Sequence, residues 1–316
     1  MSNRKITKTI AVATTFLIAA CSSQESENTP TNITSLACTN TVADSSFDGI
    51  NVNRIRSELA TPNTYEETTV RTGVTMDYMV HTHPNPKALL ILIAGSQLDA
   101  AIEGANGTGQ QATGAGGNFL VRSAHLFAAQ GYKVISIDRP SDYLDYTGGL
   151  TSGGAYDGYR TSATHFSDLQ AIIAAENTSP ALPVAIAGNS RGTISAVAQH
   201  DVADYVLLSA PVTSGGGSPI GSTGVLPSAL GGKPVHIIWH QQDDCFVSTP
   251  TGASDISVQF SNVTAVRVSG GINHPELSTR TSNQGCDGSK TYHGFVGIES
   301  CVVTNVTDWL DAQLNM

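Results

Sequence analysis

The sequence predicts an α/β fold, in which a mostly parallel central sheet carries helices on both faces. Two observations favour this class. Short, nearly continuous apolar runs alternate with segments of helical spacing, as buried parallel strands and their crossover helices do. In addition, residues 188–192 read Gly-Asn-Ser-Arg-Gly between an apolar run and a run of small, helix-compatible residues. No internal repeat and no further boundary interrupt residues 60–316, which are expected to form one domain.

The expected elements follow one another in the order that such a sheet requires. Two strand-like runs, Thr64–Arg71 and Val74–Thr82, flank Thr72-Gly73 and predict a β-hairpin. The later strands are expected at Lys87–Ala94, Tyr132–Asp138, Leu182–Ala187, Tyr205–Ala210, Pro234–His240 and Thr264–Ser269. Helices are expected at Asn118–Gln130, at Ser162–Glu176, after residue 192, and as an amphipathic final helix over Phe295–Asn315.

Composition and charge exclude several classes of protein. The chain has 316 residues, of which 40% are hydrophobic and only 13% are charged, and it contains 31 glycines. These values are typical of a loop-rich globular protein rather than a coiled coil or a disordered chain. The formal net charge is −10, and the sequence shows no basic patch. Nucleic acid is therefore not an expected partner.

The first twenty residues have the pattern of an export signal. A basic start with Arg4, Lys5 and Lys8 precedes the apolar run Ile10–Ala20, which is too short to span a bilayer comfortably. The run ends in Ile18-Ala19-Ala20-Cys21, which resembles a bacterial lipobox. Residues 1–20 are therefore expected to be a lipoprotein signal peptide. Cys21 would carry the lipid and hold the protein at a membrane surface of the cell envelope.

Two other interpretations of this start stay open, an ordinary signal peptide with a chance cysteine and an inner-membrane anchor. The choice between inner and outer membrane also stays open. Residues 21–59 are expected to form a lipid-anchored tether and N-terminal extension, because residues 22–32 are too polar to pack a core.

Beyond Cys21, the cysteines predict disulfides. An even number in an exported protein favours two bridges, with three connectivities open, and the spacings do not match a zinc site. The four residues are Cys38, Cys245, Cys286 and Cys301.

The Gly-Asn-Ser-Arg-Gly motif predicts a nucleophilic serine. A sharp turn between strand and helix would lift the Ser190 hydroxyl above the end of the sheet, where the first amides of the new helix favour negative charge. The backbone N–H of Arg191, just after the nucleophile, is one expected oxyanion donor. Ser96 is expected to supply the other, with Gln97 as the neighbouring alternative. The Arg191 side chain is expected to pair with a nearby acid rather than to bind substrate.

A serine nucleophile needs a base, and the base needs an acid to orient it. The strand that ends at His240 runs into two adjacent carboxylates, of which Asp243 is preferred over Asp244 because it comes first. For the base, His293 shortly precedes the final helix and is preferred over His274. The order along the chain is thus serine, acid, histidine.

At these motifs the chain resembles the α/β-hydrolase family of serine hydrolases. The likeness is carried by Gly188–Gly192, by Asp243-Asp244-Cys245 and by His293-Gly294-Phe295. The stretches HQQDDC and YHGF also resemble a bacterial branch in which a cysteine after the acid is bridged to one before the histidine. The resemblance implies the pairs Cys245–Cys286 and Cys38–Cys301. The strand end Ala94-Gly95 departs from the family's His-Gly.

Three further patterns are given less weight. Residues 107–112 match a dinucleotide fingerprint loosely but follow no strand. His81 and His83 share one strand face without a third metal ligand. Tyrosines between residues 143 and 159 suit a cap that lines a substrate pocket or ordinary loop packing equally well.

The sequence as a whole predicts an exported, lipid-anchored serine hydrolase that cleaves an ester bond, or second to that an amide bond, in a small molecule. The expected acyl-enzyme mechanism uses Ser190, His293 and Asp243 and requires no metal or organic cofactor. Two alternatives stay open: a non-catalytic envelope binding protein on the same fold, and a peptidase or lactone hydrolase.

Overall fold

The computed structural model describes residues 33–39, 63–95, 98, 100, 102–103, 111–112, 118–143, 156–215, 218–222, 224–271, 284–288 and 291–316. The expected signal peptide, Cys21, Ser96, Gln97 and His274 lie outside the described residues.

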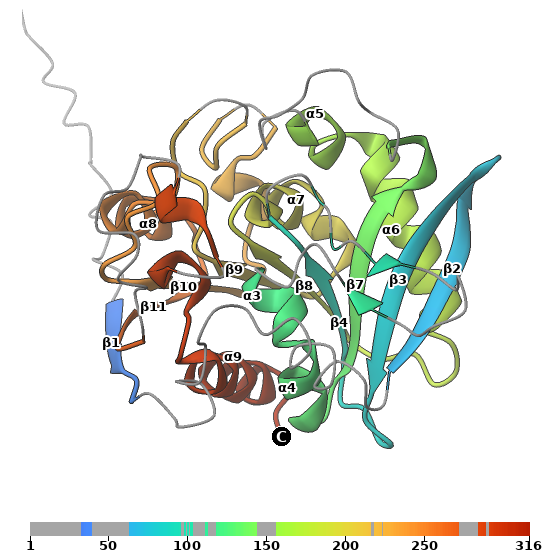
Figure 1. Ribbon diagram of the computed structural model, residues 1–316, viewed down its shortest axis with the longest axis horizontal. Helices are drawn as coiled ribbons and strands as arrows, with labels where there is room; N and C mark the ends of the chain where they lie inside the picture. The colour runs from blue at the N-terminus through green and yellow to red at the C-terminus, as the bar shows by residue number, and fades with distance from the viewer. Residues whose placement is uncertain are drawn as a thin grey trace, which may run out of the picture.

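A nine-stranded sheet forms the centre of the molecule, with strand order β1-β11-β10-β9-β8-β4-β7-β3-β2 (Figure 1). The strands are β1 (Ile33–Ala37), β2 (Asn63–Arg71), β3 (Val74–Thr82), β4 (Leu89–Ile93), β7 (Lys133–Pro140), β8 (Val184–Asn189), β9 (Tyr205–Ser209), β10 (Val235–His240) and β11 (Val263–Ser269). The β2–β3 and β3–β7 pairs are antiparallel, and the other pairs in this sheet are parallel. The predicted hairpin and the predicted mostly parallel sheet are thereby confirmed.

Two further strands, β5 (Ile102–Glu103) and β6 (Gln111–Ala112), form a small antiparallel pair of their own. The larger described helices are α3 (Phe119–Arg122), α4 (Ala124–Ala129), α5 (Asp157–Arg160), α6 (Ala163–Glu176), α7 (Gly192–Ala198), α8 (Pro250–Ser257) and α9 (Glu299–Gln313). Short 3-10 turns include η2 (Ser141–Tyr143), η4 (His200–Val202), η5 (Pro227–Leu230), η7 (Gln284–Cys286) and η8 (Tyr292–Gly294). None of the described helices is long and apolar enough to cross a membrane.

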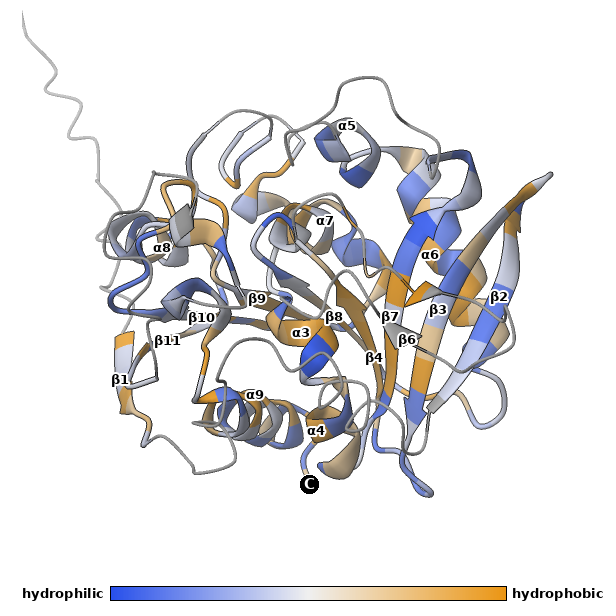
Figure 2. Cartoon of the chain, viewed as in Figure 1, coloured by the Kyte–Doolittle hydropathy of each residue, from blue (hydrophilic) through white to orange (hydrophobic). Residues whose placement is uncertain are grey.

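Helices cover both faces of the sheet because successive strand residues point to opposite sides. On one face, Ile91 and Ile186 pack with residues of α6, α7 and α8 in one core cluster. On the other, Leu90 and Ala185 pack with residues of α3, α4 and α9 in a second cluster. Figure 2 shows the apolar colouring concentrated in β4, β7 and β8 between these layers. Burial on both faces explains why these strands have nearly continuous apolar sequences.

The sheet extends into residues 21–59, the segment expected to be a tether and N-terminal extension. Residues Ile33–Ala37 form β1, which pairs in parallel with β11 at the edge of the sheet. Directly after β1, Cys38 is buried and forms a disulfide with Cys301 of α9. The folded body therefore includes residues ahead of the expected boundary at residue 60. A five-residue strand with mainly half-buried and exposed positions gives little periodic signal in the sequence.

Two helices differ from their expected bounds. The helix predicted over residues 118–130 is split at Ser123, which caps both α3 and α4. The final helix begins at Glu299 rather than Phe295. Phe295 and Gly297 have φ values of 57° and 82°, in the left-handed region that cannot continue a right-handed helix. Residues 295–298, just before α9, therefore do not belong to the helix. They continue the segment that carries His293, residues 291–298, which is called the histidine segment below.

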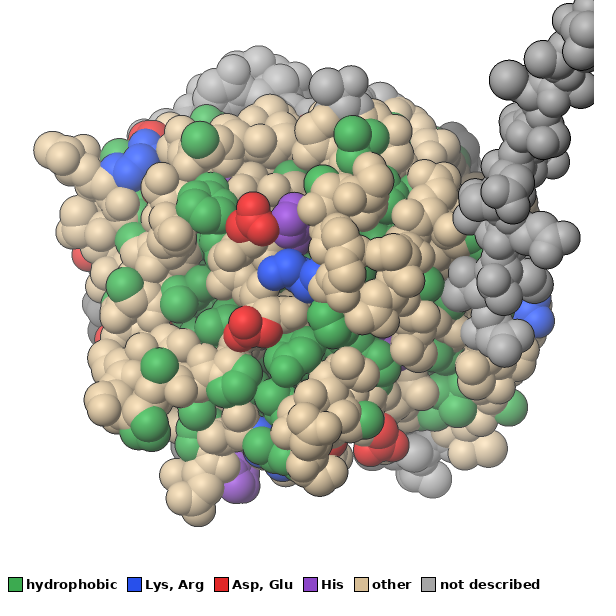
Figure 3. Space-filling view, turned by 180° about the vertical axis from the view of Figure 1, so that it is seen from behind, with side chains coloured by type: hydrophobic (Ala, Val, Ile, Leu, Met, Phe, Trp, Pro, Cys, Tyr) green, Lys and Arg blue, Asp and Glu red, His purple; other side chains and the backbone are tan. Residues whose placement is uncertain are grey.

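Basic side chains do not gather into a patch on the described part of the face shown in Figure 3, where blue appears at a few separate places among tan and green. This scattered pattern accords with the net charge of −10.

Candidate active site

The serine motif forms a sharp turn between β8 and α7. Ser190 directly follows β8 and has a φ of 53°, and α7 begins at Gly192. A Cβ added at Gly188 would collide with the backbone of Gly192, and one added at Gly192 would collide with the carbonyl of Ile93. Only glycine fits at both positions, so the motif's glycines are required by close backbone packing. Ser190 itself is half-buried at the carboxyl end of the sheet.

Neighbouring groups hold this turn in place. The N–H of Ser190 donates to the carbonyl of Ser209 at 3.0 Å, and the Asn189 side chain donates to the Ser209 hydroxyl at 3.2 Å. Asn118, the cap of α3, donates to Asn189 at 3.1 Å. Gly95 lies so close that a Cβ there would be 2.8 Å from the Cβ of Ser190. Ala94-Gly95 at the end of β4 therefore borders the serine directly.

Asp243 is the carboxylate that meets the histidine. Its Oδ2 lies 2.8 Å from Nδ1 of His293, and its Oδ1 accepts from the N–H of Cys245 at 2.9 Å. Asp243 is buried, whereas Asp244 is exposed. A buried carboxylate with both oxygens hydrogen-bonded can fix the tautomer and the orientation of an imidazole.

Only one ring nitrogen of His293, Nδ1, takes part in the described hydrogen bonds. The residue is buried, and within the described residues its Nε2 has no hydrogen-bond partner. The described contacts therefore include no Ser190–His293 hydrogen bond, although such bonds are often long before substrate binds. Ser190 and Asp243 follow β8 and β10, which are separated by β9 alone. The ends of these two strands are thus two strand spacings, about 10 Å, apart.

The turn after β10 that carries Asp243, residues 241–245, is called the acid turn. It and its neighbour His240 are joined to the histidine side of the site at two further points. Cys245 and Cys286 form a disulfide. The ring of His240, at the end of β10, stacks on Tyr292 with centroids 4.1 Å apart and an interplanar angle of 5°. Burial lowers the pKa of His240, which favours its neutral form. Both disulfide pairs implied by the family resemblance, Cys245–Cys286 and Cys38–Cys301, are present.

A close backbone approach defines the histidine segment itself. A Cβ added at Gly294 would collide with the carbonyl of Gly288, so the residue after His293 must be glycine. The Thr291 hydroxyl accepts from the N–H of His293 at 3.2 Å and donates to the carbonyl of Asp287 at 2.8 Å. The start of the histidine segment is thereby held against Asp287, the residue that directly follows η7.

Two buried charged groups anchor the start of the loop after β4. Arg160, fully buried on α5, donates to the carbonyls of Ala94 and Gly95 at 3.1 and 3.2 Å. Burial lowers the pKa of Arg160 to about 9. Asp138 at the end of β7 accepts from the amides of Ala100 and Ile102 at 3.2 and 2.7 Å. The loop that was expected to supply an oxyanion donor is thus tied down on both sides of Ser96.

The side chain of Arg191 pairs with an acid, as expected. Its Nη1 lies 2.6 Å from Oδ2 of Asp157, which is buried on α5 and also accepts from the N–H of Ser218 at 2.9 Å. Its backbone, by contrast, stands at the N-terminal end of α7, directly after Ser190. Helix N-termini favour negative charge, so this position suits the expected role of its N–H.

Sequence reasoning missed the residues that support the site: Arg122, Asp138, Asp157 and Arg160. Each lies in or beside an element whose local pattern gives no sign of a distant partner. Of the tyrosine cluster, Tyr156 and Tyr159 are buried, and Tyr143 packs against Tyr159 with centroids 4.7 Å apart. The described residues contain no group of three or more His, Cys, Asp or Glu side chains placed to hold a metal ion.

Comparisons with known proteins define the fold. No family model and no curated protein sequence matches the chain. Among solved structures, Est1E from Butyrivibrio proteoclasticus with bound ferulic acid is 12% identical, with a TM-score of 0.50, over 79% of this chain and 100% of that one. The chain therefore has an α/β-hydrolase fold, as the sequence predicted, with Ser190 directly after the central strand β8.

Two other solved structures are similar to the chain. The esterase Pf2001 from Pyrococcus furiosus is 12% identical, with a TM-score of 0.49, over 81% of this chain and 94% of that one. A structure described as a predicted CIB-like hydrolase from Thermoplasma acidophilum is 14% identical, with a TM-score of 0.49, over 80% of this chain and 99% of that one.

Proposed function

We propose that the chain is a serine hydrolase that cleaves a small-molecule ester through an acyl-enzyme. Ser190 is the nucleophile, His293 the general base and Asp243 the residue that orients the base. The observation that carries the proposal is the buried Asp243–His293 hydrogen bond of 2.8 Å, two strands away from a serine in a left-handed turn.

The chemistry follows from the groups present. His293 Nε2 takes the Ser190 proton as Oγ attacks the ester carbonyl, and Asp243 stabilises the imidazolium that forms. The oxyanion is held by the N–H of Arg191 and, from outside the described residues, by that of Ser96. His293 then returns the proton to the departing alkoxide, which leaves as an alcohol. Water repeats the sequence on the acyl-enzyme, releasing the acid and restoring Ser190.

Hydrolysis of short-chain p-nitrophenyl esters tests this proposal. We expect Ser190→Ala and His293→Ala to lose roughly 10³-fold or more in kcat. The members of a triad act together, so the loss of one removes most of the rate enhancement that all three supply. Ser228→Ala, which changes an exposed serine on η5, should keep the wild-type rate. A folded Ser190→Ala protein that hydrolyses the ester at the wild-type rate would disprove the nucleophile. A folded wild type with no turnover would favour a binding protein.

We also propose that the mature protein is exported and held at a membrane of the cell envelope by a lipid on Cys21. The two disulfides support export, because such bridges persist in oxidising compartments. Metabolic labelling with a radioactive fatty acid tests the anchor. We expect label on the wild type and none on Cys21→Ala, whereas equal labelling of both would refute it.

A further inference from the structure

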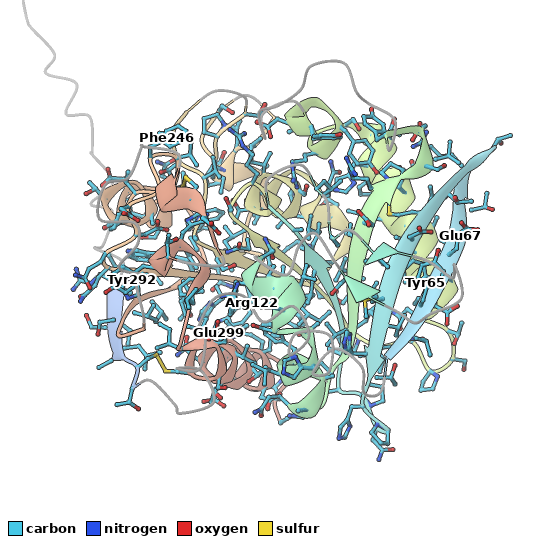
Figure 4. The ribbon with its side chains drawn as sticks, viewed as in Figure 1. Tyr65, Glu67, Arg122, Phe246, Tyr292 and Glu299 are labelled. Atoms are coloured by element: carbon cyan, nitrogen blue, oxygen red, sulfur yellow. A yellow bond between two sulfur atoms is a disulfide. The ribbon has the colours of Figure 1, made fainter. Side chains whose placement is uncertain are left out.

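The backbone around His293 rests on a buried ion pair. Arg122 at the end of α3 and Glu299 at the start of α9 lie side by side, with Nη2 and Oε1 2.9 Å apart (Figure 4). Their side chains are 3% and 7% exposed. Neither residue belongs to the expected catalytic set, and neither contacts Asp243 in the described hydrogen bonds.

Both members of the ion pair form hydrogen bonds with the backbone of the histidine segment. Arg122 donates to the carbonyl of Gly294, the residue after His293, and to that of Gly288 at 3.0 Å. Glu299 accepts from the N–H of Gly297 at 2.9 Å. The segment between these contacts includes Phe295, whose φ of 57° is unfavourable for a residue with a side chain. Such a conformation persists only where surrounding contacts determine it.

α3 also connects this segment to the serine turn. Its cap, Asn118, donates to Asn189, the residue before Ser190, at 3.1 Å. Its other end carries Arg122, and its Phe119 ring packs edge-on against Phe295 with centroids 4.9 Å apart. One short helix therefore contacts the neighbours of both the proposed nucleophile and the proposed base.

The chemistry of the guanidinium suits a positioning role better than a stabilising one. A buried ion pair contributes little net stability relative to apolar residues of similar volume. A planar guanidinium, however, presents several donors in a fixed fork and can bind two carbonyls and a carboxylate at once. An ammonium keeps the charge but not that geometry.

We propose that Arg122 is a positioning residue for His293, which it holds in register with Ser190 by fixing the carbonyls of Gly294 and Gly288. This inference rests on the proposed function of His293 as the base. Loss of the fork would let the imidazole shift, and a displacement of 1 Å in a catalytic group costs about 10²-fold in rate.

The test compares Arg122→Lys with Arg71→Lys in the full chain. Arg71 on β2 also contacts two carboxylates, Asp142 and Asp168, but lies four strand positions from β8. We expect Arg122→Lys to lower kcat on p-nitrophenyl esters about 10- to 100-fold with little change in KM, and Arg71→Lys to leave both unchanged. The downfield proton resonance of the His293–Asp243 hydrogen bond should shift or broaden in Arg122→Lys alone.

A second variant guards against a folding defect. Glu299→Gln keeps an acceptor for the N–H of Gly297 and removes the charge that pairs with Arg122. It should therefore lower kcat less than Arg122→Lys does, while the protein stays folded. The proposal is overturned if Arg122→Lys folds and keeps the wild-type kcat and imidazole resonance. If Arg122→Lys does not fold, the same result in folded Glu299→Gln overturns it. That result, with His293→Ala inactive, leaves the proposed function intact, whereas an inactive wild type would reject the function itself.

Discussion

Ser190 holds a backbone conformation that a residue with a side chain rarely adopts. Its φ of 53° places it in the left-handed region, at a cost of about 1–3 kcal/mol. The N–H of Ser190 donates to Ser209, and its carbonyl accepts from Thr193 at 2.9 Å, so the strain is held by strand and helix together. Strain of this kind is concentrated at functional sites, which accords with the role proposed for Ser190.

Two adjacent carboxylates allow a matched test at the residue scale. Asp243 is buried and meets His293, whereas Asp244 is exposed. We expect Asp243→Asn to lower kcat by about 10⁴-fold, because the amide leaves the imidazole in the wrong tautomer, and Asp244→Asn to stay near wild type. Steady-state ester hydrolysis measures both. The reverse ranking would move the acid to Asp244.

The turn between β8 and α7 leaves no room for a side chain at its glycines. A Cβ at Gly192 would meet the carbonyl of Ile93, whereas one at Gly158, on the exposed side of α5, would meet nothing within 4 Å. We expect Gly192→Ala to lower the free energy of unfolding by about 3 kcal/mol, because the main chain must move. Gly158→Ala should change it by less than about 1 kcal/mol, in the stabilising direction.

Urea unfolding followed by circular dichroism measures the two alanine variants. If Gly192→Ala were as stable as Gly158→Ala, the close packing of the turn against β4 would be wrong.

Elements with strong local patterns were predictable from the sequence. The apolar run Leu89–Ile93 and the glycine–serine–glycine turn carry their own signal, since burial on both faces and tight turns restrict residue type locally. The helix predicted over Ser162–Glu176 is present as α6. The structure shows that Ser162 is its cap, whose hydroxyl accepts from the N–H of His165 at 3.1 Å.

Elements that depend on distant partners were not predictable. β1 is determined by pairing with β11 and by the bridge from Cys38, and both partners lie more than two hundred residues away. The same holds within the site. Asp243 and His293 could be proposed from their order along the chain, but Arg122 contacts Gly288 and Gly294 across more than 160 positions. A single sequence carries no local trace of such contacts.

At the scale of the whole molecule, the two disulfides connect different parts of the fold. Cys38–Cys301 closes 263 residues and ties the edge strand to α9, whereas Cys245–Cys286 joins the acid turn to the histidine side across 41 residues. A bridge stabilises mainly by restricting the unfolded chain, and more so for a longer loop.

We therefore expect two different phenotypes from the paired serine variants. Cys38→Ser/Cys301→Ser should lose about 2–5 kcal/mol of stability and keep its kcat. Cys245→Ser/Cys286→Ser should lower kcat, because the acid and the base lose a shared constraint. Thermal unfolding and ester kinetics on both proteins measure this. Equal kcat values in the two variants would show that the shorter bridge does not support the site.

Three buried histidines contribute to the pH dependence of stability. Burial lowers the pKa of His81 and His236 to about 4, and burial together with the charge of Arg160 lowers that of His165 to about 3. The unfolded state therefore binds more protons below the ordinary histidine pKa of about 6.5. Stability contributed by these neutral rings is complete above that pH and is lost as the pH falls toward 4.

Comparing the wild type with His165→Leu isolates one of these groups. The wild type should lose up to about 1.4 kcal/mol more per pH unit below pH 6.5 than the variant, and chemical unfolding at several pH values measures the difference. Parallel curves for the two proteins would show that His165 is not neutral in the folded state.

The reaction of the folded chain with a fluorophosphonate tests the central claim most directly, because the reagent traps an activated serine covalently. Peptide mass mapping of the labelled protein should find one adduct, on Ser190, and Ser190→Ala should remain unlabelled. Labelling of a different serine, or none on folded wild-type protein, would contradict the account.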